Sequence, residues 1–149
     1  MTHEDFIKIA INLAHENVAA GGQPYGAIAV RRSENQAGGV EIIGRSKNNN
    51  GILHAEIAAI NNAFENTGQF WMGDCALYSS CEPCDMCRAC AEHVGIKKIY
   101  YAMDYEDAKL MGHDDIICQE SKQPIECELI RNQEIIDLVK NFYDELKKQ

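Results

Sequence analysis

Cysteines and one histidine are the residues of this sequence best suited to bind a metal ion. The run 81–90 holds four cysteines at intervals of three residues, and His54 lies upstream. A Cys-x-x-Cys pair supplies two thiolates to one ion, and a distant His can supply a third ligand. We therefore expect His54, Cys84 and Cys87 to bind one zinc ion. The fourth tetrahedral position is then open for water, as in catalytic rather than structural zinc sites.

Glu56 follows the metal-binding His by two residues and can transfer protons to and from the water without being a ligand itself. His-x-Glu followed by Pro-Cys-x-x-Cys is the signature of zinc-dependent nucleobase deaminases. The chain satisfies this pattern at every position, from His54 and Glu56 to Pro83, Cys84 and Cys87. The pattern predicts that water adds to an aminated ring carbon, Glu56 moves the protons, ammonia leaves and a carbonyl remains.

The two outer cysteines leave another interpretation open. Cys81 and Cys90 can complete a closed structural zinc site, and four cysteines at this spacing resemble part of an iron–sulfur binding run. The spacing to the last cysteine is two residues rather than three, and the His-x-Glu motif would then have no role. We expect the remaining cysteines to pack as small apolar residues, namely Cys75, Cys118 and Cys127.

The elements that must position these groups alternate along the chain. Apolar periodicity and turn residues predict helices at 2–20, 54–64, 83–94, 104–111 and 132–148. Short apolar runs predict strands at 27–30, 40–44, 75–79, 97–102 and 124–130, the first two joined as a hairpin. This order predicts an α/β fold, in which helices cover both faces of a mixed sheet of about five strands.

Two of these helices should meet at the metal with their N-terminal ends. One carries His54 and Glu56, and the other carries Cys84 and Cys87. Residues three apart on a helix face the same way, so both sulfurs can reach one ion. The positive end of each helix dipole favours thiolates there.

Composition limits the class of partner. The 149 residues are 46% hydrophobic, which suits one domain over 1–149. The net charge of −9 opposes nucleic-acid binding, since that binding depends on Lys and Arg. No export signal or membrane span is recognised in the sequence. Seven cysteines, an odd number, then favour free thiols in a reducing cytoplasm.

Beyond the signature, three phrases closely resemble bacterial guanine deaminases of the cytidine deaminase superfamily. They are Thr2–Phe6, Ser80–Cys87 and Asp107–Asp115, and the resemblance spans roughly residues 1–120. It implies a three-layer α/β/α cytidine deaminase-like fold with one zinc ion per subunit. The implied reaction is hydrolysis of guanine to xanthine and ammonia by a homodimer, in which the C-terminal segment (about 124–149) can exchange between subunits.

The resemblance also implies roles for single residues. His54, Cys84 and Cys87 look like the zinc ligands, Glu56 like the proton shuttle, and Asp115 like an acidic residue that contacts the purine and assists proton transfer. The remaining expected substrate contacts are Tyr25, Asn48, Ala55, Glu82 and His93.

The chain departs from the family pattern near the pocket. Glu92 and His93 stand where the family has a Tyr-Trp pair, the loop carrying Asn48 is shorter, and the C-terminus lacks the family's aromatic ending. These changes bear on which base is the substrate and leave the type of reaction unchanged. The open alternatives are a tRNA adenosine deaminase, a cytosine or nucleoside deaminase (including one for guanosine), and a non-catalytic zinc-containing protein.

Overall fold

A computed structural model describes residues 1–33, 39–110 and 124–148. Within these ranges the strands form one five-stranded sheet in the order β2-β1-β3-β4-β5. β1 pairs antiparallel with β2 and β3, whereas β3, β4 and β5 run parallel. The mixed α/β sheet is therefore confirmed. The strands are β1 (Ala27–Ser33), β2 (Gly39–Arg45), β3 (Cys75–Ser79), β4 (Lys98–Tyr101) and β5 (Glu126–Leu129).

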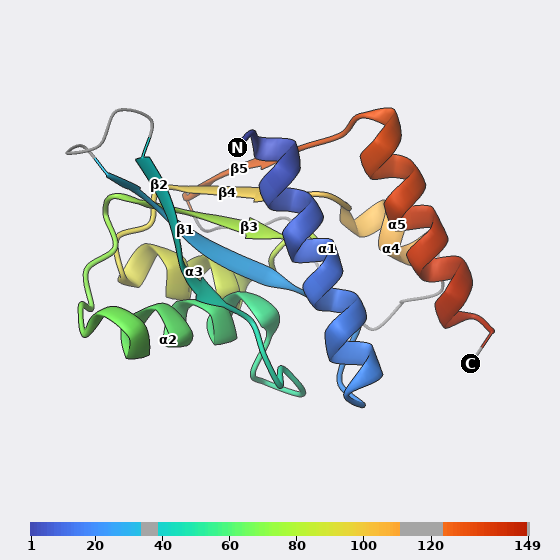
Figure 1. The fold of residues 1–149 in the computed structure, drawn as a ribbon, viewed down its shortest axis with the longest axis horizontal. Coiled ribbons are helices and arrows are strands. Elements are labelled where there is room, and N and C mark those ends of the chain that lie inside the picture. Colours follow the sequence, from blue (N-terminus) through green and yellow to red (C-terminus); the bar gives the residue numbers. More distant parts are fainter. Residues whose placement is uncertain (34–38, 111–123, 149) are drawn as a thin grey trace.

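Helices cover both faces of the sheet (Figure 1). One layer contains α1 (His3–Ala19) and α5 (Gln133–Leu146), and the other contains α2 (Ala55–Thr67) and α3 (Asp85–His93). The short helix α4 (Tyr105–Leu110) follows β4, and its Ala108 joins the apolar cluster of the α1–α5 layer. Each layer has its own apolar cluster, and the sheet separates the two. No helix in the described part of the chain has the length and apolar character needed to cross a bilayer.

The first helix begins at a capping box, as its sequence predicts. The Thr2 hydroxyl accepts a hydrogen bond from the Asp5 backbone N–H, and the Asp5 carboxylate accepts one from the Thr2 N–H at 2.8 Å. Spacings of three and four residues predict an apolar face on α1 made of Phe6, Ile9, Ala10, Leu13, Ala14 and Val18, and the face that is buried is broader. Ile7 and Ile11 are almost fully buried there, because α1 packs against both the sheet and α5.

Two glycines allow helices to approach the sheet closely. A Cβ on Gly26 would lie 2.1 Å from the Ala10 carbonyl oxygen of α1. A Cβ on Gly44 in β2 would lie 2.2 Å from the Ala59 carbonyl oxygen of α2. Each distance is far below a van der Waals contact, so only glycine permits this packing.

The C-terminal elements complete the sheet and helix layer of their own chain. β5 pairs with β4, and α5 buries Ile135, Val139 and Phe142 in the cluster that α1 also lines. Exchange of the segment 124–149 between subunits, which the resemblance implies, is thus not needed to complete the described fold.

Candidate metal centre and active site

Two residues of the predicted site are helix N-caps. His54 caps α2 and Cys84 caps α3, and both have extended backbone conformations. Neither side chain makes a capping hydrogen bond, so the imidazole and the sulfur are available to a ligand. The sequence had predicted α2 to begin one residue earlier and α3 two residues earlier, with His54 and Pro83 in their first turns. Pro83 instead precedes the cap and is fully buried.

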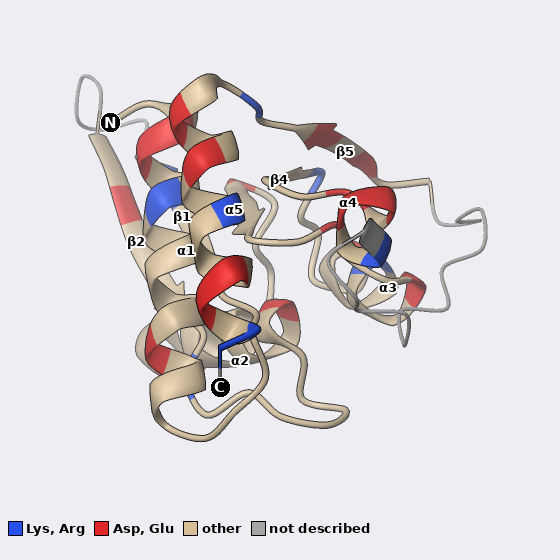
Figure 2. Cartoon of the chain, turned by 90° about the vertical axis from the view of Figure 1, so that its right-hand side faces the viewer, with Lys and Arg blue, Asp and Glu red and all other residues tan. Residues whose placement is uncertain are grey.

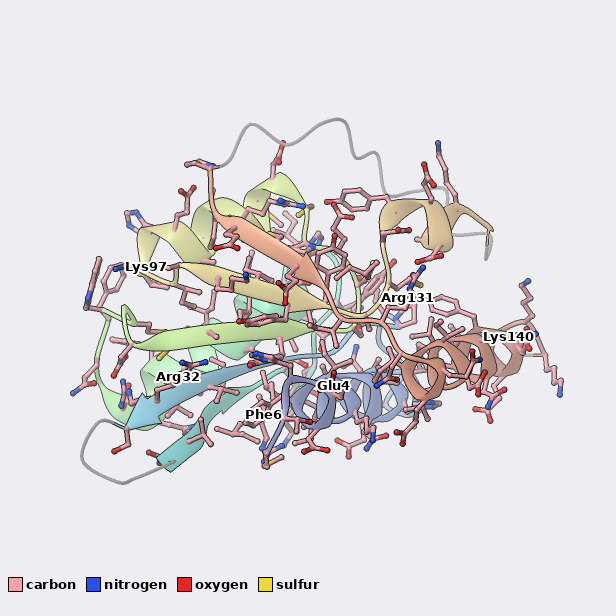
Figure 3. The ribbon with its side chains drawn as sticks, turned by 90° about the horizontal axis from the view of Figure 1, so that it is seen from above. Glu4, Phe6, Arg32, Lys97, Arg131 and Lys140 are labelled. Carbon is pink, nitrogen blue, oxygen red and sulfur yellow. The ribbon has the colours of Figure 1, made fainter. Side chains whose placement is uncertain are left out.

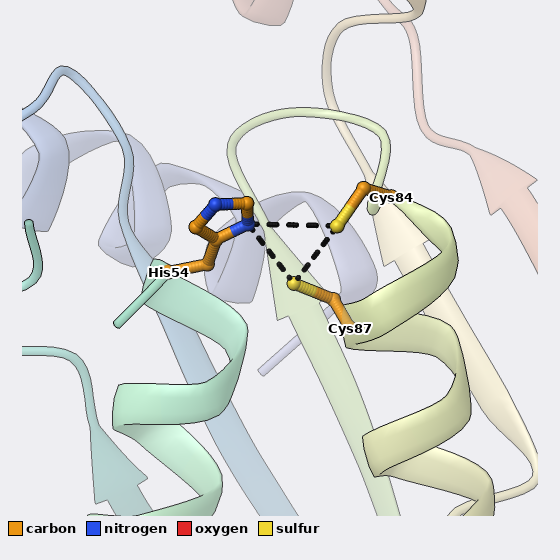
Figure 4. A group of neighbouring side chains, drawn as sticks. All are labelled: His54, Cys84 and Cys87. Atoms are coloured by element: carbon orange, nitrogen blue, oxygen red, sulfur yellow. Dashed lines mark hydrogen bonds between the residues drawn. The ribbon is translucent and has the colours of Figure 1, made fainter. Parts of the chain in front are cut away.

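Cys87 lies in the first turn of α3 and completes a triangle of donor atoms (Figure 4). His54 Nδ1 lies 3.5 Å from Cys84 Sγ and 3.4 Å from Cys87 Sγ, and the two sulfurs are 3.5 Å apart. Tetrahedral zinc, with bonds of about 2.3 Å to S and 2.0–2.1 Å to N, separates S from N by about 3.6 Å and S from S by about 3.8 Å. The three donors therefore fit zinc with little rearrangement, and they are the metal-binding group found among the described residues.

The two thiols influence each other's protonation. Hydrogen bonding to Cys87 lowers the pKa of Cys84 to about 5. The same contact, together with burial, raises the pKa of Cys87. Both sulfurs cannot readily ionise side by side unless a cation compensates their charge. This donor chemistry also favours a divalent metal between them.

Glu56 lies beside the donor triangle, in the first turn of α2. Its carboxylate is buried, with Oε2 3.2 Å from Cys87 Sγ. Burial raises the pKa of Glu56, and hydrogen bonds from Ser79 and Cys87 partly oppose that rise. A carboxyl group that binds a proton more readily than usual is suited to accept one and pass it on.

Ser79 is a site residue that sequence reasoning missed. It is fully buried at the end of β3, and its hydroxyl donates to Glu56 Oε1 at 2.5 Å. The hydroxyl thus fixes the carboxylate relative to the sulfurs. A polar residue at the end of an otherwise apolar strand was the only signal, since 23 residues separate the partners.

The outer cysteines do not join the metal group. Cys81 packs in the apolar cluster of the α1–α5 layer, whereas Cys90 packs against the cluster on the other face of the sheet. The structure therefore does not support the alternative of a four-cysteine cluster. Cys118 and Asp115 lie outside the described residues.

The residues expected to contact substrate lie in different environments. Ala55 is buried at the start of α2, next to His54. Tyr25 is partly buried against both apolar clusters, and its carbonyl accepts a hydrogen bond from Asn49. Asn48 is exposed at a positive φ of 55°. Neighbouring Asn49 is buried, and its Oδ1 has no hydrogen-bond partner among the described residues.

Glu82 and His93 have partners away from the donor triangle. The Glu82 carboxylate pairs with Arg88 at 2.9 Å. His93 is at the C-terminal end of α3, six residues and about 9 Å of helix rise beyond Cys87. Its ring contacts Phe70 edge-on, with centroids 5.6 Å apart. Within this chain His93 therefore lies away from the donor triangle, and its expected contact with substrate stays a prediction.

The fold and the site together define a zinc-binding deaminase domain. Residues 1–103 match the family model for the cytidine and deoxycytidylate deaminase zinc-binding region. The chain belongs to this family.

The relatives of this chain within the family include deaminases named for different substrates. The guanine deaminase of Bacillus subtilis (strain 168) is 40% identical over 128 residues, covering 85% of this chain and 81% of that protein. The crystal structure of guanine deaminase from B. subtilis has a TM-score of 0.66 at 32% identity, covering 97% of this chain and 95% of that chain. A tRNA-specific adenosine deaminase from Rickettsia bellii is 40% identical over 83 residues, which are 52% of this chain and 54% of that protein.

Proposed function

We propose that this chain hydrolyses an aminated purine base, with guanine as the first candidate, to give xanthine and ammonia. The observation that carries the reaction type is the buried Glu56 carboxylate beside three donors spaced for zinc. The similarity to a guanine deaminase over 85% of the chain supports the choice of base. A single domain over 1–149 suits this function.

The metal ligands, Glu56 and Ser79 would have different roles in the reaction. Zinc held by His54, Cys84 and Cys87 would supply Lewis-acid activation of water at neutral pH. Glu56 takes a proton from the attacking water and delivers it to a ring nitrogen, then protonates the departing amine. Ser79 keeps the carboxylate oriented. The exocyclic C–N bond breaks, a C=O bond replaces it, and ammonia carries away the amine nitrogen.

Residues outside the metal group would contact the substrate. Asp115 assists proton transfer, as the family resemblance implies, and Tyr25 and Ala55 shape the pocket. The amide that orients the base comes from the loop before α2. Asn48 is the match by resemblance, and the buried Asn49 is an alternative because its Oδ1 lacks a partner among the described residues.

We also propose that the protein is a homodimer in a reducing cytoplasm. Exposed apolar side chains near α2 and at the start of α3 would suit a second copy of the chain; they are Ile52, Leu53, Phe64 and Met86. The thiols of Cys75, Cys84, Cys87, Cys90 and Cys127 are free, which suits a reducing compartment. Sedimentation of the zinc-loaded protein at micromolar concentration tests the dimer, and a monomer there would contradict it.

Nucleic acid is not the expected substrate. Acidic residues recur along α1, α4, β5 and α5, with only scattered basic residues among them (Figure 2). The formal charge is −9. An anticodon stem would need a basic surface to neutralise its phosphates. The match to the tRNA-specific adenosine deaminase of R. bellii, which covers about half of each chain, makes tRNA the rival substrate to test.

The test is ammonia release by the purified zinc-loaded protein. The panel contains guanine, guanosine, adenine, cytosine, cytidine and an anticodon stem-loop RNA. We expect guanine to be consumed at least tenfold faster than every other compound. Faster release from another member would overturn guanine as the substrate. No release from any of them would overturn the catalytic proposal and favour the non-catalytic alternative.

A further inference from the structure

Arg88 is a buried cation that the reaction does not use. It follows Cys87 directly on α3, yet only 8% of it is exposed. Its Nη2 donates to Glu82 Oε2 at 2.9 Å, with side-chain exposures of 10% and 16% for Arg88 and Glu82. A buried ion pair costs desolvation energy and is weak evidence for stability by itself. The position of this pair relative to the metal ligands suggests another role.

The Arg88 side chain reaches back to the two residues that precede Cys84. Its Nε donates to the Pro83 carbonyl oxygen at 2.9 Å, while its backbone N–H donates to the Cys84 carbonyl at 2.9 Å. Pro83 immediately precedes Cys84, and Arg88 immediately follows Cys87. These two hydrogen bonds therefore close the turn that contains both thiolates. The guanidinium itself has hydrogen bonds to Pro83 and Glu82 rather than to either sulfur.

Neighbouring elements hold the same turn from outside. The Tyr105 hydroxyl of α4 also donates to the Pro83 carbonyl, and the Glu82 N–H donates to the Met103 carbonyl at 2.7 Å. α4 is anchored in turn by an ion pair between Asp107 and Arg131, which lies between β5 and α5 (Figure 3). The Glu82–Pro83 segment thus has contacts from α3, α4 and the residues after β4.

We propose that Arg88 is a positioning residue that keeps Cys84 and Cys87 at zinc-binding separation and so sets how long the metal is retained. The inference depends on the proposed zinc site but not on guanine as the substrate. The guanidinium suits this role because its planar fork donates to Pro83 O and to Glu82 from two separate nitrogens, whereas a lysine ammonium offers one nitrogen without the fixed fork. Outer groups that orient metal ligands typically change metal affinity 10- to 100-fold.

The test is the rate of zinc transfer from the full-length protein to a colorimetric chelator in excess. Arg88→Met should release zinc at least tenfold faster than the wild type, and Arg88→Lys should be intermediate. The matched control is Arg31→Met, which breaks the Arg31–Asp74 ion pair between β1 and the residue before β3. Its release rate should remain within twofold of the wild type.

A second variant separates positioning from loss of a buried charge partner. Glu82→Gln combined with Arg88→Met leaves no unpaired carboxylate, so thermal stability of the zinc-free protein should recover relative to Arg88→Met alone. Zinc release should remain fast, because the bond to Pro83 O is still missing.

Recovery of slow release in this double variant, or release within twofold of wild type in Arg88→Met, would overturn the inference. Wild-type protein that binds no zinc would overturn it together with the metal site. Zinc binding without guanine turnover would overturn only the substrate.

Discussion

His54 Nδ1 and Cys84 Sγ lie 3.5 Å apart, although each belongs to the N-cap of a different helix. Both cap residues have an extended backbone, and neither side chain is used in a capping hydrogen bond. The positive ends of both helix dipoles then meet at the donors, where they favour thiolate and carboxylate charge. The same arrangement brings Glu56, in the first turn of α2, to the edge of the site.

Replacing Glu56 by Gln should abolish turnover while zinc binding remains. The amide has nearly the same shape but cannot accept a proton, so kcat should fall by about 10²–10⁴. Metal content measured by atomic absorption should stay at one zinc per chain. The matched control is Glu65→Gln, an exposed position on the same helix, which should retain wild-type kcat. Substantial activity in Glu56→Gln would contradict its role as the proton shuttle.

Replacing Ser79 by Ala should reduce kcat by roughly tenfold with little change in zinc content. The substitution removes the hydrogen bond that orients Glu56, and such bonds to charged groups contribute about 1.5–3 kcal/mol. Ser80→Ala is the neighbouring control, because its hydroxyl accepts from the Gly26 N–H rather than contacting Glu56. Equal losses in the two variants would indicate a general packing effect at the end of β3.

Metal binding should depend on Cys84 and not on Cys81. Cys84→Ala removes one corner of the donor triangle, so zinc stoichiometry after dialysis should fall well below one per chain. Cys81→Ala should retain one zinc, since Cys81 packs in the apolar cluster of the α1–α5 layer. Loss of metal in both variants would favour the four-cysteine site instead.

The loop before α2 can be tested at Asn48. Its positive φ means that Ala would add backbone strain, whereas Gly accepts this conformation. Asn48→Gly therefore removes the amide while keeping the turn. If Asn48 orients the base, KM for guanine should rise about tenfold or more, and Asn49→Ala should affect KM less. The reverse order would assign the contact to Asn49.

The capping box of α1 predicts a pH-dependent contribution to stability. The hydrogen bond from the Thr2 N–H lowers the pKa of Asp5 below its ordinary 3.8. A lowered carboxyl pKa means that the stabilisation is complete above the unfolded value and is lost as pH falls through the folded value. Asp5→Asn should therefore melt at a lower temperature than wild type at pH 6, and the difference should shrink below about pH 4. Circular dichroism of the zinc-free proteins measures the two melting temperatures. A difference that stays the same from pH 6 to below pH 4 would show that the Asp5 carboxylate is not its source.

Apolar periodicity, helix caps and turn residues predicted most of the helices and strands, because each of these signals lies within a short stretch of sequence. The strand Cys75–Ser79 was predicted with its observed bounds, and the Thr2 cap follows from two residues three apart. Ile7 and Ile11 were missed because adjacent apolar rows on a helix have the same spacing, and only the position of α5 decides which row is central. The pairing of Arg88 with Pro83 O was not predictable, because it depends on how the segment before Cys84 folds back.

Gly44 has a consequence for the active site, although it lies in β2 and has no side chain. Its bare Cα lets Ala59 of α2 approach the strand, so the depth at which α2 rests on the sheet is set there. His54 and Glu56 are fixed to the same helix, whereas both sulfurs are fixed to α3. A methyl group at Gly44 would push α2 away from the sheet and so move His54 and Glu56 relative to Cys84 and Cys87. The distance between acid–base group and metal thus depends on a contact that no pocket residue makes.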